Sequence, residues 1–217
     1  MNIKDLEKID SKKMYQTYDK WPEIAKNGFD SDFKKFDVKG IDHIVFSGMG
    51  GSGSIGDVIS AILSKEDIHV SNVKGYHLPK TVDSNSLVVA TSISGNTKET
   101  LAVLEKAQKT NAKIAVFSSG GMMQKFSKTN NLFFQEISMI HSPRASFPKF
   151  LFSILNILKE IIPIKKIGVE ESISSLEITK NNIFSNNLTE ENISLKLAKW
   201  IKEIPLIYYP WGLQSAA

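Results

Sequence analysis

Short apolar runs alternate with amphipathic segments through the middle of the chain. Several of the runs end in glycine, serine or threonine, which is typical of buried parallel strands that lead into tight turns. Between the runs, apolar residues recur at three- and four-residue spacing, which predicts helices. The predicted strands are 41–47, 68–76, 87–92, 113–118 and 132–136, and the predicted helices between them are 55–63, 97–109 and 122–128.

This alternation predicts an α/β fold, a three-layer αβα parallel sheet of the flavodoxin-like or Rossmann-like kind. Parallel strands joined by helices place those helices on both faces of the sheet. In such folds, ligands bind at the carboxyl ends of the strands, where the strand-to-helix turns lie. The turns after the predicted strands are therefore the place to look for chemistry.

The flanking segments read as helical. Residues 2–26 carry apolar positions at helical spacing, with Pro22 suited to a break or to a new first turn. Further helices are expected over 147–162 and over 172–204, the latter interrupted by an asparagine-rich segment. Residues 204–209 (IPLIYY) predict another strand, with which a second α/β domain would begin. We expect four parts: an N-terminal helical segment (1–40), a first domain (41–157), connecting helices (158–203) and the start of a second domain (204–217).

Composition narrows the classes of function. The formal net charge of +4 mildly favours an anionic ligand, and the lysines are spread too evenly for a nucleic-acid binder. The absence of cysteine excludes disulfides, thiolate metal sites and a cysteine nucleophile. The charged N-terminus lacks the apolar core of a signal peptide. We expect a cytoplasmic protein with no cofactor, metal, nucleic-acid or membrane partner.

The first candidate site is the glycine-rich tract 48–56 (GMGGSGSIG), between a strand and a helix. Glycine permits positive φ and a close approach of the backbone to a ligand, and a helix start presents N–H groups to an anion. Gly48, Gly50 and Gly53 also spell the dinucleotide pattern G-x-G-x-x-G. That interpretation needs an acid at the end of the second strand, and the second strand has none there. A purely structural tight turn is a further alternative.

The second candidate is the hydroxyl-rich tract 91–97 (TSISGNT), again between a strand and a helix. Several hydroxyl groups on one turn can donate hydrogen bonds to phosphate oxygens. The alternative is an ordinary helix cap at Asn96 or Thr97 with additional serines. Two such turns at the carboxyl ends of neighbouring strands favour a shared anion site.

The third candidate is Arg144, the only arginine of the chain, in the segment 142–146 (SPRAS). A planar guanidinium suits bidentate recognition or charge stabilisation. A surface arginine without a function is the alternative.

In this order, GMGGSGSIGD, TSISGNTKETL and SPRAS resemble the N-terminal half of the bifunctional phosphoglucose/phosphomannose isomerases, which belong to the SIS (sugar isomerase) superfamily. The S-x-S-G-N-T pattern is the most specific of the three, because related amidotransferase isomerase domains usually read S-Q-S-G-E-T. One departure is GGSGSIGD, where the family commonly reads G-G-S-A-I-G-G-D.

The resemblance implies a role for each matching residue. Arg144 would stabilise the charge of an enediolate intermediate, and Gly51 would let the sugar approach. The hydroxyl groups that would bind the substrate phosphate belong to Ser52, Ser92, Ser94 and Thr97. The resemblance also implies a homodimer, and a reaction that converts glucose 6-phosphate or mannose 6-phosphate to fructose 6-phosphate.

The glutamate that moves the proton in this family lies in a motif resembling N-E-N-A-K, which is absent from the 217 residues. The ring-opening histidine of the neighbouring subunit matches none of His43, His69, His77 or His141. We therefore expect the chain alone to bind weakly or to fail in turnover. Two alternatives remain open: a sugar-phosphate sensor without chemistry, and a nicotinamide-dependent oxidoreductase. The choice between glucose and mannose epimers also stays open.

Overall fold

The computed structural model describes residues 2–201, which form two compact units. One unit, residues 25–164, contains the sheet. The other is helical and combines residues 2–24 with residues 165–201. The predicted strand over 204–209, and with it the predicted second domain, lies outside the described residues.

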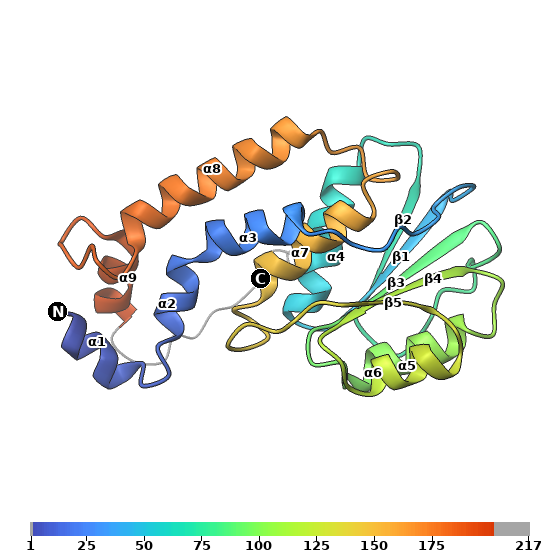
Figure 1. Cartoon of the computed structure of the whole chain (residues 1–217), viewed down its shortest axis with the longest axis horizontal. Helices are drawn as coiled ribbons and strands as arrows, with labels where there is room; N and C mark the ends of the chain where they lie inside the picture. The colour runs from blue at the N-terminus through green and yellow to red at the C-terminus, as the bar shows by residue number, and fades with distance from the viewer. Residues whose placement is uncertain (1, 202–217) are drawn as a thin grey trace. The chain divides into compact units, whose positions relative to one another are not determined.

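The sheet has five parallel strands in the order β2-β1-β3-β4-β5 (Figure 1). Every predicted strand is present, with ends within three residues of the prediction. The strands are β1 (His43–Ser47), β2 (His69–Val73), β3 (Ser86–Ser92), β4 (Lys113–Ser118) and β5 (Phe133–Glu136). The three-layer α/β prediction is therefore confirmed.

Helices cover both faces of the sheet (Figure 1). On one face lie α5 (Lys98–Ala107) and α6 (Gly121–Thr129), and on the other lie α4 (Gly51–Leu63) and α7 (Phe147–Ile157). The central strand β3 is buried along its whole length, because its side chains alternate between two covered faces.

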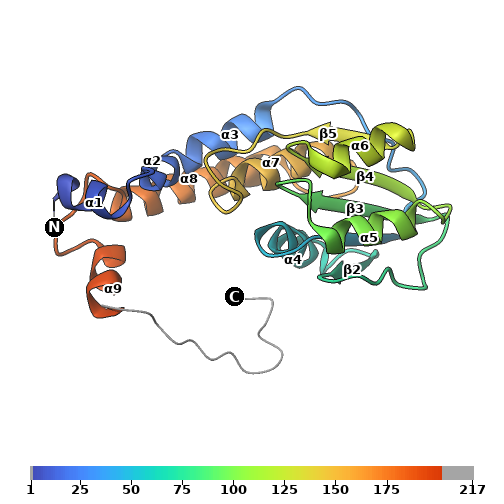
Figure 2. The same cartoon turned by 90° about the horizontal axis from the view of Figure 1, so that it is seen from below.

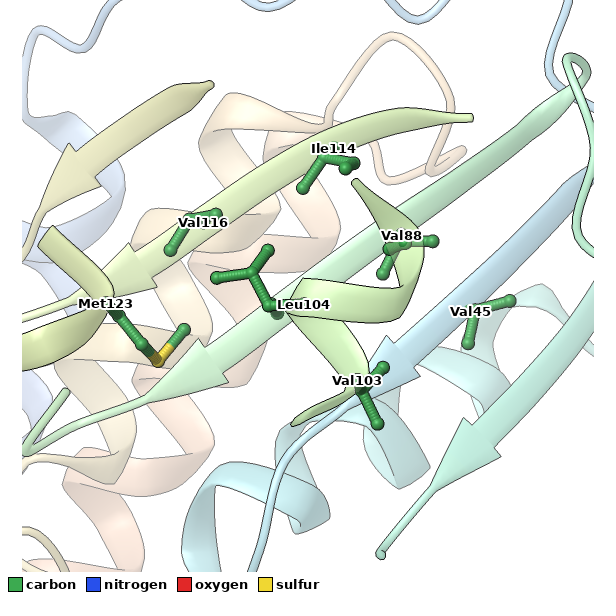
Figure 3. Packing of buried hydrophobic residues seen from close by; sticks show 9 residues of the cluster. Val45, Val88, Val103, Leu104, Ile114, Val116 and Met123 are labelled. Carbon is green, nitrogen blue, oxygen red and sulfur yellow. The ribbon is translucent and has the colours of Figure 1, made fainter. Parts of the chain in front are cut away.

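The core on the α5 and α6 face is a cluster of aliphatic side chains from alternate strand positions. Val103 and Leu104 of α5 and Met123 of α6 point toward β1, β3 and β4 (Figure 3). The cluster consists of Val45, Val88, Ala90, Val103, Leu104, Ala107, Ile114, Val116 and Met123. On the opposite face, α4 lies so close to β1 that a Cβ on Gly56 would stand 2.7 Å from the Cβ of Phe46.

The helical unit contains α1 (Ile3–Ile9), α2 (Met14–Asp19), α8 (Lys166–Ile183) and α9 (Ile193–Ile201), which are labelled in Figure 2. The boundary between the two units, after Ile24, falls within α3 (Trp21–Asp30). Residues 2–26 are helical as predicted, but they contribute to three helices, with a break around residues 10–13 that the apolar pattern did not indicate. Asp10 accepts a hydrogen bond from the amide of Tyr15 at 2.9 Å, and Lys13 adopts a φ of 55°. The break expected at Pro22 is present as the first turn of α3.

Two further helix predictions need adjustment. Helix α7 ends at Ile157 and not near residue 162. The predicted helix over 172–204 begins earlier, at Lys166, and its asparagine-rich interruption is confirmed as the loop between α8 and α9. Asn192 lies in this loop and accepts the amide of Leu195 at 2.9 Å, which caps α9. In the part of the chain that the structure describes, no helix combines the length and apolar character needed to cross a membrane.

The helical unit contains a cavity of about 440 Å³ that sequence patterns did not predict. Aromatic residues from both segments of this unit contribute to its wall. They include Tyr15, Tyr18, Trp21 and Phe184.

Candidate functional site

The candidate residues come from two turns at the carboxyl edge of the sheet. Strands β1 and β3 are direct neighbours with parallel register, so Ser47 pairs with Ala90. The turn after β1, residues 48–51, is called the glycine turn below. The turn after β3, residues 92–97, is called the serine turn. Because both strands are parallel, both turns leave the sheet at the same edge.

The glycine turn is tight enough to require its glycines. Gly50 has a φ of 53°, in the left-handed region that favours glycine. A Cβ on Gly48 would stand 2.8 Å from the carbonyl carbon of Ser52, and a Cβ on Gly53 would stand 2.7 Å from the oxygen of Gly48. A Cβ on Gly51 would instead point into open space. Because α4 begins here, the positive end of its helix dipole lies at this edge. The start of α4 has no side-chain cap.

The serine turn is organised by the hydroxyl of Ser92. Ser92 is 1% exposed, and its Oγ accepts the amide of Gly95 at 3.1 Å and lies 2.7 Å from Oγ1 of Thr97. Ser94 is exposed, and its Oγ lies 3.5 Å from Oγ of Ser92, within hydrogen-bond distance. Thr97 is the N-cap of α5, but its side chain makes no cap hydrogen bond. The first N–H groups of a helix have no acceptor within that helix, so the start of α5 can present donors to an anion.

One hydrogen bond joins the serine turn to the start of α4, which directly follows the glycine turn. The amide of Ile93 in the serine turn donates to Oγ of Ser52 at 3.3 Å. Ser52 stands in the first turn of α4 and is half-buried. The structure therefore brings Ser52 together with Ser92, Ser94 and Thr97 at one place on the sheet edge.

Arg144 has a different setting. It is exposed and lies in the loop that leads into α7. Ser146 fixes this loop, since its Oγ accepts the amide of Ile140 at 2.8 Å and donates to the carbonyl of Ser142 at 2.8 Å. Within residues 2–201, the Arg144 guanidinium makes no hydrogen bond or ion pair with the four hydroxyl residues. Its predicted role in charge stabilisation stays a prediction.

Sequence reasoning missed a third element of the site, the β4–α6 turn. Because β4 lies beside β3, its turn packs against the serine turn: the amide and the hydroxyl of Ser119 both donate to the carbonyl of Ile93, at 3.1 Å and 2.6 Å. A Cβ on Gly95 would stand 1.9 Å from the oxygen of Gly120. The sequence signal for this turn is the Gly120-Gly121 pair between β4 and the body of α6.

The four histidines lie away from these turns in the sequence, and His43 and His69 are at the opposite, amino ends of their strands. Among the residues that the structure describes, no group of three histidine, aspartate or glutamate side chains is arranged to hold a metal ion.

The comparisons with known proteins agree with this geometry. The SIS domain family matches residues 39–133, which include the glycine turn, the serine turn and the β4–α6 turn. The chain therefore contains an SIS domain, at residues 39–133. Its relatives include a bifunctional phosphoglucose/phosphomannose isomerase of Thermoplasma acidophilum, 31% identical over 87% of this chain and 56% of the relative. The resemblance to that isomerase family is thereby confirmed.

A second relative is the D-glucosamine-6-phosphate 4-epimerase of Sulfolobus acidocaldarius, 30% identical over 68% of this chain and 46% of the relative. A crystal structure of a candidate phosphosugar isomerase from Clostridium difficile 630 shares the fold. Its TM-score is 0.58 at 20% identity, and the match covers 93% of this chain and 56% of that one. The chain spans about half the length of these curated relatives and of others that it matches.

Proposed function

We propose that this chain supplies the phosphate-binding site of an isomerase that interconverts glucose 6-phosphate or mannose 6-phosphate with fructose 6-phosphate. The observation that carries the proposal is the contact between Ser52 and Ile93. This contact supports the proposal because it joins the serine turn, which leads into α5, to a hydroxyl in the first turn of α4. Hydroxyl and amide donors at a helix N-terminus suit a dianionic phosphate.

In this proposal, the phosphate is the anchor and not the reacting group. Binding at a distance from the reacting carbons supplies energy that orients C1 and C2 of the sugar. Ser94 and Thr97 would contact the phosphate from the serine turn, and Ser52 from the start of α4. Gly51 would leave room for the sugar, because its Cβ position is open.

The chemical step needs a base and stabilisation of an oxyanion. A carboxylate would take the proton from one carbon and return it to the neighbouring carbon. Arg144 would offset the negative charge that develops on the enediolate oxygens. The family's N-E-N-A-K motif is absent from the 217 residues, so this chain by itself is expected to bind the sugar phosphate without turnover.

The binding experiment uses the 217-residue chain with fructose 6-phosphate, unphosphorylated fructose, glucosamine 6-phosphate and NAD as separate ligands, measured by calorimetry or saturation-transfer NMR. Fructose 6-phosphate should bind and fructose should not, because the site recognises the phosphate. Ser94→Ala should raise the dissociation constant of fructose 6-phosphate about tenfold, since it removes a hydrogen bond to a charged group. Ser64→Ala, an exposed serine at the end of α4, is the matched control and should bind as wild type.

Binding of NAD in place of the sugar phosphate would contradict the proposal and support the dinucleotide alternative. A sugar-phosphate sensor would bind the same ligands, so turnover separates it from an isomerase. The full-length gene product should produce glucose 6-phosphate from fructose 6-phosphate in an assay coupled to glucose-6-phosphate dehydrogenase.

A further inference from the structure

Asn96 lies in the serine turn, but its side chain acts on a different helix from the one that follows it. Its Oδ1 accepts the amide of Met122 in the first turn of α6 at 3.0 Å. Its Nδ2 donates to the carbonyl of Ser94 at 3.1 Å. Asn96 was one of the two residues expected to cap α5, but its side chain caps α6 instead. There it accepts an N–H group that has no acceptor within α6.

A second hydrogen bond strengthens this connection. The amide of Met123 donates to the carbonyl of Gly95 at 2.9 Å. Two consecutive N–H groups of α6 are thus held by two consecutive residues of the serine turn. The fit leaves no room for a side chain at position 121, the first residue of α6, because a Cβ on Gly121 would stand 2.7 Å from Oδ1 of Asn96.

These contacts leave the first turns of α5 and α6 in different states. The start of α6 is occupied by Asn96 and Gly95. The start of α5, with Thr97 as its N-cap, is left without a side-chain cap. An acceptor at position 96 therefore fixes the serine turn against α6 and leaves the donors of α5 for an anion.

We propose that Asn96 is a positioning residue of the phosphate site, which holds Ser94 and Thr97 in place through α6 and couples ligand binding to the order of the first turn of α6. The inference rests on the proposed function, since it assigns the serine turn to an anion. Asn96 itself does not touch the ligand. Any ligand that immobilises the serine turn also immobilises the acceptors of Met122 and Met123, so it should slow the opening of these two hydrogen bonds.

The test compares wild type with Asn96→Ala by two measurements. One is the dissociation constant of fructose 6-phosphate, and the other is the exchange of the Met122 and Met123 amides with water, measured by NMR. In wild type, saturating fructose 6-phosphate should slow both amides several-fold. Asn96→Ala should speed the exchange of the Met122 amide about tenfold without ligand, raise the dissociation constant about tenfold, and abolish most of the slowing by ligand.

Two further variants make the test specific. Asn96→Asp keeps an oxygen that accepts the Met122 amide, so it should retain slow exchange at α6 while its negative charge weakens binding of the phosphate. Asn111→Ala replaces an exposed asparagine after α5 and should match wild type in both measurements.

Weakened binding with unchanged exchange at Met122 would mean that Asn96 contacts the ligand directly, and would overturn the inference. Unchanged binding in Asn96→Ala would overturn it as well. If wild type binds no fructose 6-phosphate, the proposed function fails together with the inference. If wild type binds fructose 6-phosphate and Asn96→Ala gives the same dissociation constant and amide exchange as Asn111→Ala, only the inference fails.

Discussion

The two ends of strands β1 and β3 both carry polar side chains, and the contrast between them shows why only the carboxyl end is a candidate for binding an anion. At the amino ends, Nε2 of His43 lies 3.0 Å from Oγ of Ser71 on β2. On the other side, Nδ1 of His43 lies 3.5 Å from Oγ of Ser86, which donates to Asp83 at 2.9 Å. Each polar atom in this chain of contacts has a protein partner, and the chain ends on a carboxylate.

At the carboxyl ends, the hydroxyls stand beside helix starts. Ser92 and Thr97 contact each other, and Ser52 accepts the amide of Ile93. The N–H groups that begin α4 and α5 lie at the same edge, and neither helix has a side-chain cap. Serine side chains occur at both edges of the sheet, but only the carboxyl edge adds helix N-termini with backbone donors and a favourable dipole. The difference arises from chain direction in a parallel sheet.

The largest expected effect concerns the packing of the carboxyl edge. Gly95→Ala places a Cβ 1.9 Å from the oxygen of Gly120, at a residue whose φ is 70°. The clash and the strain should lower the free energy of unfolding by more than about 3 kcal/mol, measured by urea denaturation. Gly75→Ala is the control, because no atom lies within 4 Å of its Cβ position, and it should change stability by less than about 1 kcal/mol. Equal losses in the two variants would show that the serine turn does not pack as described.

A pair of serine substitutions should separate the two edges by function. Ser86→Ala, at the amino edge, removes a fully buried hydroxyl that donates to Asp83 and should cost about 1–3 kcal/mol of stability. It should leave the affinity for fructose 6-phosphate unchanged. Ser52→Ala, at the carboxyl edge, should weaken that affinity about tenfold. Calorimetric titration and denaturation of both variants test the contrast, which fails if Ser86→Ala weakens ligand binding as much as Ser52→Ala does.

The smallest expected effect is a pH dependence that arises at the amino edge. Burial lowers the pKa of His43 below its usual value of 6.5, and the positive charge of His69 lowers it further, against smaller opposing contributions that include Asp83 and Asp42. The folded protein therefore binds fewer protons than the unfolded chain as the pH falls below about 7. The stability that neutral His43 contributes is therefore fully present above pH 6.5, the pKa of histidine in the unfolded chain. It is lost as the pH falls from 6.5 to the lower pKa of His43 in the folded protein, with a slope of at most about 1.4 kcal/mol per pH unit.

Denaturation between pH 7.5 and 5 measures this slope. His43→Gln should reduce it, because the variant has no proton to gain at this position. His77→Asn replaces an exposed histidine and should keep the wild-type slope. An unchanged slope in His43→Gln would show that the acid sensitivity comes from another group.

Much of the fold could be predicted because each strand is a local apolar pattern. Strand β4 begins and ends at the predicted residues, since Lys113 and Ser118 bound an uninterrupted apolar run. The break at residues 10–13 was not predicted because helical periodicity persists through Asp10 and Lys13, where the backbone leaves the helix. Periodicity reports which face is apolar, but it does not report a single residue with positive φ.

The sequence by itself determined the order of strands and helices, the two hydroxyl-bearing turns and the family resemblance, because these depend on local residue patterns. Only the tertiary structure decided which turns become neighbours. The pairing of β1 with β3 brought Ser52 to Ile93, and the pairing of β3 with β4 assigned Asn96 to α6 instead of α5. These contacts join residues 41 and 26 positions apart, and such distant pairs are set by how the strands assemble into the sheet, which no local pattern encodes.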